Sequence, residues 1–130
     1  MDDVKLHFKK LWLSIGWGMI ITIIVLSLTP PQPVMQIIEH ADKIGHFIAY
    51  FAVMAWFAQI YHTNRFYSVL GLILLGLGIE ILQGMTSNRH FSWLDLLTNF
   101  IGISLAWQIT KNKLARILIS LENFFVQNKI

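Results

Sequence analysis

The chain has 130 residues, of which 55% are hydrophobic and only 13% charged, and its formal net charge is +3. Because soluble domains carry about a quarter charged residues, this composition excludes an ordinary soluble domain and indicates a membrane protein. The absence of cysteine excludes disulfides, thiolate metal ligands and a cysteine nucleophile. The basic residues lie at the ends of apolar runs, which is typical of membrane topology, so no nucleic-acid partner is expected.

Four apolar runs follow one another along the chain, each bounded by polar residues or prolines. They cover residues 11–28, 44–61, 66–82 and 94–109. These runs are short for segments that cross a bilayer, so we expect some of the helices to extend by a turn into their polar flanks. The first run has no convincing small-residue cleavage site after it, so it is interpreted as an uncleaved span.

Lysine and arginine are distributed unevenly between the two sides of these spans. With the N-terminus inside, eight of them fall on inner segments, whereas only Lys43 and Arg89 fall on outer loops. The positive-inside rule therefore predicts that both termini are cytoplasmic.

The pattern changes after the fourth run. Between residues 112 and 127, apolar side chains recur at three- and four-residue spacing with polar residues between them. This spacing predicts an amphipathic helix on the inner membrane surface, and a helix that binds a partner protein is the alternative. The predicted fold is all-α, a single domain over residues 1–130. It is an integral membrane bundle of four transmembrane helices plus a C-terminal amphipathic surface helix.

Polar residues of the second to fourth spans fall at one depth, near the outer membrane face. They are Asp42, Lys43, His46, Glu80, Gln83, Arg89, Asp95 and Asn99. Asp42 and His46 are four residues apart, as are Asp95 and Asn99, so each pair shares a helix face. Ionisable groups at membrane depth usually face the bundle interior and pair with one another. We therefore expect these side chains to converge in a compensated polar cluster.

Three interpretations of such a cluster remain open. It can be a structural lock that holds three helices together. It can bind membrane lipids or a lipid-linked envelope precursor, with Lys43 and Arg89 on a phosphate and Asp42, Gln83 and Asn99 on hydroxyl or amine groups.

The third interpretation is an enzyme. His46 would act as general acid or base, with Glu80 or Asp95 as a second acid–base group. No cofactor is expected from this pattern, and a divalent metal on Asp42, His46, Glu80 and Asp95 is the variant.

Four short motifs connect these residues to a known family. They are DKIGHF at 42–47, EILQ at 80–83, RHF at 89–91 and DLLTNFIG at 95–102. In this order and spacing they resemble the VanZ-like family of small bacterial membrane proteins, named for a teicoplanin-resistance protein. The resemblance covers residues 42–106, and Ala106 stands where a second glycine would be expected.

The resemblance implies a multi-pass protein of the bacterial cytoplasmic (inner) membrane with a shared site at the outer face. It implies a connection to the cell envelope or to glycopeptide tolerance, and it supplies no settled reaction. The predicted function is therefore recognition or processing of an envelope amphiphile at the outer leaflet.

Overall fold

The structure is a computed structural model that describes residues 6–29, 41–86, 90–112 and 117–128. In this part of the chain it contains helices and no strand. The helices are α1 (Lys9–Leu28), α3 (Ala41–Ile60), α4 (Arg65–Met85), α5 (Trp93–Asn112) and α6 (Ile117–Gln127). Each of the four long helices contains nearly all of one predicted apolar run and extends past it into the polar flanks.

Three of the helices are long and apolar enough to cross a membrane. They are α1, the segment Lys43–Ile60 within α3, and α4. α5 has a comparable length of 20 residues, but its polar side chains keep it out of this group. The all-helical, membrane-type fold is confirmed, and the fourth span stays a prediction.

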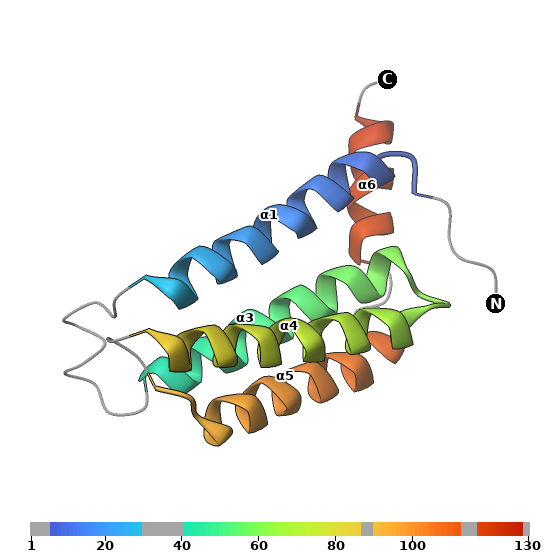
Figure 1. Ribbon diagram of the computed structural model, residues 1–130. Coiled ribbons are helices and arrows are strands. Elements are labelled where there is room, and N and C mark those ends of the chain that lie inside the picture. Colours follow the sequence, from blue (N-terminus) through green and yellow to red (C-terminus); the bar gives the residue numbers. More distant parts are fainter. Residues whose placement is uncertain (1–5, 30–40, 87–89, 113–116, 129–130) are drawn as a thin grey trace.

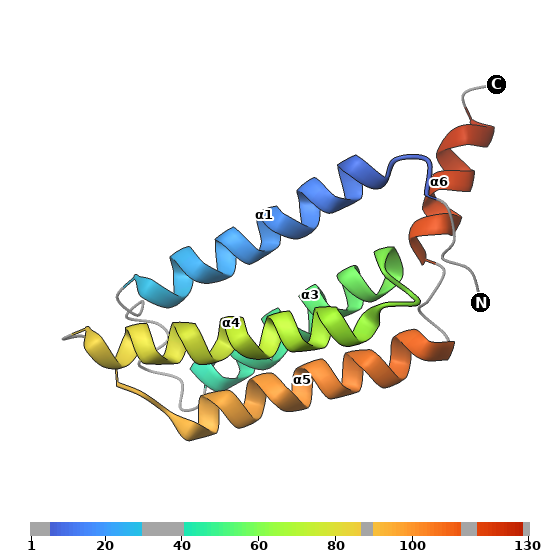
Figure 2. The same cartoon turned by 45° about the vertical axis from the view of Figure 1, so that its right-hand side comes forward.

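The helices α3, α4 and α5 run side by side, with α1 on the opposite side of α3 and α4 from α5 (Figures 1 and 2). α3 packs most extensively against α5. A Cβ atom added at Gly102 on α5 would lie only 2.7 Å from the backbone oxygen of Phe47 on α3. The two backbones therefore approach each other as closely as glycine permits.

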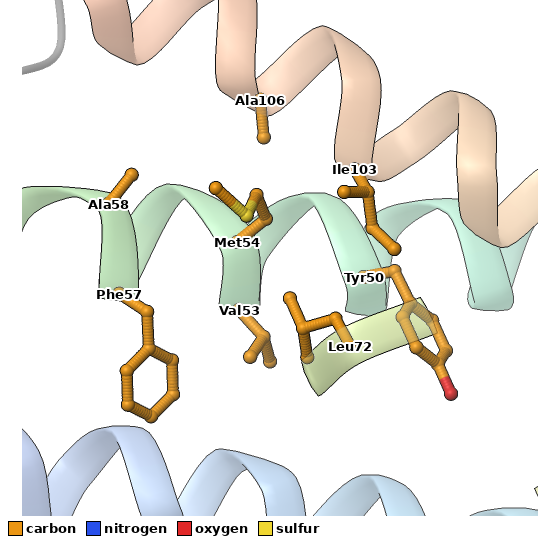
Figure 3. Packing of buried hydrophobic residues seen from close by; sticks show 8 residues of the cluster. All are labelled: Tyr50, Val53, Met54, Phe57, Ala58, Leu72, Ile103 and Ala106. Atoms are coloured by element: carbon orange, nitrogen blue, oxygen red, sulfur yellow. The ribbon is translucent and has the colours of Figure 1, made fainter. Parts of the chain in front are cut away.

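α3 is the central helix of the apolar core. Figure 3 shows the core side chains Tyr50, Val53, Met54, Phe57 and Ala58 of α3, Leu72 of α4, and Ile103 and Ala106 of α5. α1 is bound more loosely, through the Trp56 Nε1 donor to the Trp12 carbonyl at 2.9 Å and through close approach of Gly16 to the Phe57 ring. The outward side chains of α1 stay exposed, as expected of a lipid-facing helix.

α6 crosses the end of the bundle, transverse to the other helices (Figure 1). The Glu122 carboxylate accepts hydrogen bonds from the backbone N–H of His7 at 2.9 Å, from that of Phe8 at 2.8 Å and from Trp12 Nε1 at 2.6 Å. Leu118 N donates to Gln59 Oε1 at 3.0 Å. These contacts tie α6 to the start of α1 and the end of α3.

Burial by itself would raise the pKa of Glu122, but the hydrogen bonds from Phe8, Trp12 and His7 outweigh it and lower the pKa below its ordinary value. α6 also exposes the apolar side chains Ile117, Leu121, Phe124 and Phe125. The predicted tail helix, placed at residues 112–127, is observed from Ile117, because Asn112 belongs to α5. Its position on a membrane surface stays a prediction.

Candidate functional site

Five of the predicted site residues lie together where α3 and α5 begin and α4 ends, at the left in Figure 1. We call them the polar cluster: Lys43 and His46 of α3, Glu80 of α4, and Asp95 and Asn99 of α5. All of them except Lys43 are at most 8% exposed. Charged and polar side chains are rarely buried so deeply without specific partners.

His46 joins α3 to α5. Its Nδ1 lies 3.1 Å from Asn99 Oδ1, and because an amide oxygen only accepts, Nδ1 carries the hydrogen and donates. The other ring nitrogen, Nε2, faces Asp95 Oδ2 at 3.9 Å. Since His46 and Asp95 lie on different helices, this pair exists only when α3 and α5 are packed.

Ser92 connects the two carboxylates of the cluster. Its backbone N–H donates to Glu80 Oε2 at 3.0 Å, and its hydroxyl oxygen accepts from the backbone N–H of Asp95 at 3.3 Å. Ser92 directly precedes α5 and thus occupies its N-cap position, where serine is favoured. The turn before α5 therefore positions Glu80 and Asp95 together.

Lys43 supplies a positive charge at the rim of the cluster. Its ammonium nitrogen lies 3.6 Å from Asp95 Oδ1, with the lysine side chain about one-third exposed. Gln83 points elsewhere: its Nε2 donates to the backbone oxygen of Ser27 at 2.6 Å, so it ties α4 to the end of α1. The Asp42 side chain and Arg89 lie outside the described residues.

Tyr50 is a neighbour of the cluster that the sequence interpretation left out. It is 1% exposed, and its ring stacks with that of His46 at a centroid distance of 6.5 Å. Its hydroxyl has no hydrogen-bond partner among the described residues and is directed away from the aliphatic core side chains (Figure 3). Its position four residues after His46 was the available signal, because side chains at this spacing share a helix face.

The polar cluster borders an apolar groove between α4 and α5. This groove has a volume of about 400 Å³, and Asn99 contributes to its wall together with Gly76, Leu97, Phe100 and other apolar residues. A larger apolar cavity of about 470 Å³ lies between α1, α3 and α4 and includes no member of the cluster in its lining. The α4–α5 groove is therefore the apolar space that adjoins the polar side chains.

The cluster combines one imidazole with two buried carboxylates. One ligand atom from each of His46, Glu80 and Asp95 can be chosen so that all three lie within 4.8 Å of one another. Such a set can exchange protons or hold a cation, and Lys43 beside it can meet an anion.

No curated protein and no solved structure matched the chain. A family model described as VanZ/LLP1 matches residues 4–117, which include all four long helices and every residue of the polar cluster. The chain thus belongs to the VanZ/LLP1 family.

Proposed function

We propose that this VanZ/LLP1-family protein is a four-span protein of the bacterial cytoplasmic membrane whose polar cluster recognises or processes an envelope amphiphile at the outer leaflet. The observation that carries the proposal is the position of the buried cluster beside the apolar α4–α5 groove. An amphiphile requires a polar contact and an apolar contact within one molecular length, and this end of the bundle offers both.

Charge distribution supports the orientation. The end of the bundle opposite the polar cluster carries the basic residues Lys9, Lys10, Arg65 and Lys111. By the positive-inside rule that end faces the cytoplasm and the cluster faces outward. α5 packs more extensively against α3 than against any other helix, so it would cross with α3 as the fourth span, with Asp95 and Asn99 directed toward that neighbour.

In this proposal, the headgroup and the hydrocarbon chain of the amphiphile contact different residues. Lys43 is partly exposed and can reach a phosphate or another anionic headgroup. Hydrocarbon would fill the α4–α5 groove past Leu97 and Phe100. Recognition is the simpler activity, and proton transfer through His46 would add processing of the headgroup.

A structural lock is the competing function, because the contact of His46 with Asn99 and that of Lys43 with Asp95 join the same two helices. Filling the α4–α5 groove distinguishes the two functions, because it should prevent amphiphile binding but leave a structural lock intact. Leu97 is 54% exposed in the groove wall, so Leu97→Trp should block a lipid chain without touching the lock.

The test is native mass spectrometry of the protein purified from bacterial membranes in mild detergent. Wild type should retain an envelope amphiphile, and Glu80→Gln and Leu97→Trp should lose it. Ile101→Ala is the matched control, since Ile101 lies on α5, is 43% exposed and does not line the groove. Equal lipid retention by all four proteins would refute the proposal.

Tolerance of a lipid-binding glycopeptide such as teicoplanin is the phenotype to measure in cells. Glu80→Gln and Arg89→Ala should abolish any tolerance while protein abundance stays near that of wild type. Because an unpaired buried charge costs about 3–5 kcal/mol, abundance has to be measured in the same cells. Loss of tolerance that follows abundance equally in these variants and in Ile101→Ala would favour the lock.

A further inference from the structure

The contact with Asn99 determines which ring nitrogen of His46 carries the hydrogen. Asn99 Oδ1 accepts from Nδ1 at 3.1 Å, so a neutral His46 ring carries its lone pair on Nε2. That nitrogen faces the Asp95 carboxylate at 3.9 Å. A cation between these two atoms, either a second proton on the ring or a metal ion, would join the lone pair to the carboxylate.

The separation favours a metal ion. A hydrogen bond between Nε2–H and Oδ2 would bring the two atoms to about 2.7–3.0 Å, well inside the observed 3.9 Å. Two ligands that each lie about 2.1 Å from one ion are separated by at most about 4.2 Å, and the observed distance falls within that limit. The third ligand, Glu80, lies within 4.8 Å, so a carboxylate displacement of less than about 1 Å completes the set.

The groups around the ligands are those that metal sites use. A histidine ligand generally donates its second ring N–H to an oxygen, and here Asn99 accepts it. Ligating carboxylates are themselves hydrogen-bonded, and here the Ser92 N–H donates to Glu80 Oε2. Lys43 faces Asp95 Oδ1 and leaves Oδ2 for the ion.

From these contacts we infer that His46 Nε2, Glu80 and Asp95 Oδ2 bind one divalent transition-metal ion, of the Zn²⁺ or Mn²⁺ type. Three protein ligands leave open positions on the ion, as in catalytic rather than structural sites. An anionic oxygen of a headgroup would bind there, beside Lys43. This role rests on the proposed function, whereas metal binding itself does not.

The test uses the full-length protein in detergent, first treated with EDTA and then titrated with ZnCl₂ or MnCl₂. Isothermal titration and elemental analysis after desalting should give about one ion per chain. Affinity should fall at least 100-fold in His46→Gln and in Asp95→Asn, and about 10–100-fold in Asn99→Leu, which removes only the acceptor for Nδ1–H. His62→Gln, a histidine change in the turn between α3 and α4, should bind as wild type does.

A second measurement needs no variant. Electron spin-echo modulation of the Mn²⁺-loaded wild type should show coupling to an imidazole nitrogen. Absence of that coupling, failure of wild type to bind an ion, or unchanged affinity in folded His46→Gln would each overturn the inference. If the protein retains lipid but binds no ion, the metal inference fails and the proposed function stands. If it binds an ion but no amphiphile co-purifies, the metal inference stands and the proposed function fails.

Discussion

Gly102→Ala tests the close approach of α3 and α5 on which the polar cluster depends. The added Cβ would lie 2.7 Å from the Phe47 backbone oxygen, whereas ordinary contact begins at 3.4 Å. The helices would have to separate locally by about 0.7 Å, and backbone cannot rotate away as a flexible side chain would. Overpacking of this kind costs about 1–3 kcal/mol, and the gain in helix propensity returns up to about 1 kcal/mol. We expect a net loss of up to about 2 kcal/mol in the free energy of unfolding, and a stability about 1–3 kcal/mol below that of a Gly→Ala variant elsewhere in a helix that meets no neighbour.

The effect should extend to the site, because Asn99 lies one turn before Gly102 and His46 directly precedes Phe47. A separation of about 0.7 Å would lengthen the 3.1 Å contact between His46 Nδ1 and Asn99 Oδ1 beyond hydrogen-bonding range. Unfolding in detergent–SDS mixtures followed by circular dichroism measures the stability. Gly78→Ala is the control, since a Cβ there meets nothing within 4 Å. A Gly102→Ala protein as stable as Gly78→Ala would refute the reasoning.

Three further predictions concern the connections between elements. The pKa of Glu122 is lowered from its ordinary value of 4.5, so its contacts stabilise the fold above that pH and are lost as pH falls through the lower folded-state value. Hydrogen exchange in α6 should therefore increase on acidification in wild type, and Glu122→Gln should remove this dependence. Gln83→Leu deletes the donor to Ser27 O and should cost about 1 kcal/mol, with faster exchange confined to the last turn of α1; unchanged exchange there would contradict it. Single cysteines at Gln36 and Asn64 should be labelled from outside by an impermeant reagent at Gln36 only, and the opposite result would invert the topology.

The helices themselves could be predicted because lipid imposes a simple requirement. Every backbone group must be paired within the segment, so each long apolar run becomes a helix whose ends lie near the first polar residues. The runs predicted at 66–82 and 94–109 became α4 (Arg65–Met85) and α5 (Trp93–Asn112), each extended into its polar flanks. What composition could not decide is the fourth span, because α5 directs polar side chains to a neighbour and so has lower hydropathy.

The convergence of His46 with Asp95 and Asn99 followed from helical spacing and common depth. Gln83 shows where that argument fails. Three residues correspond to about 300° around a helix, so Gln83 and Glu80 diverge by about 60° and reach different neighbours. The neighbour that Gln83 reaches depends on the angle at which α1 packs against α4, and no local sequence pattern encodes that angle.

Glu122 could not be predicted as a buried residue for a related reason. A carboxylate in an amphipathic surface helix is ordinarily solvated. Its partners are 110 to 115 residues away in the sequence. Only the tertiary structure reveals that the face of α6 with Leu118 and Glu122 is its docking face.

The same contact affects how the protein is made. Chains are synthesised from the N-terminus, so α1 is made long before Glu122 exists to accept the hydrogen bonds of His7 and Phe8. The attachment of α1 is completed only when α6 has left the ribosome. A chain truncated after α5 would keep its polar cluster and the Trp56 bond to Trp12, but it would lose the hydrogen bonds that hold His7 and Phe8 at the start of α1.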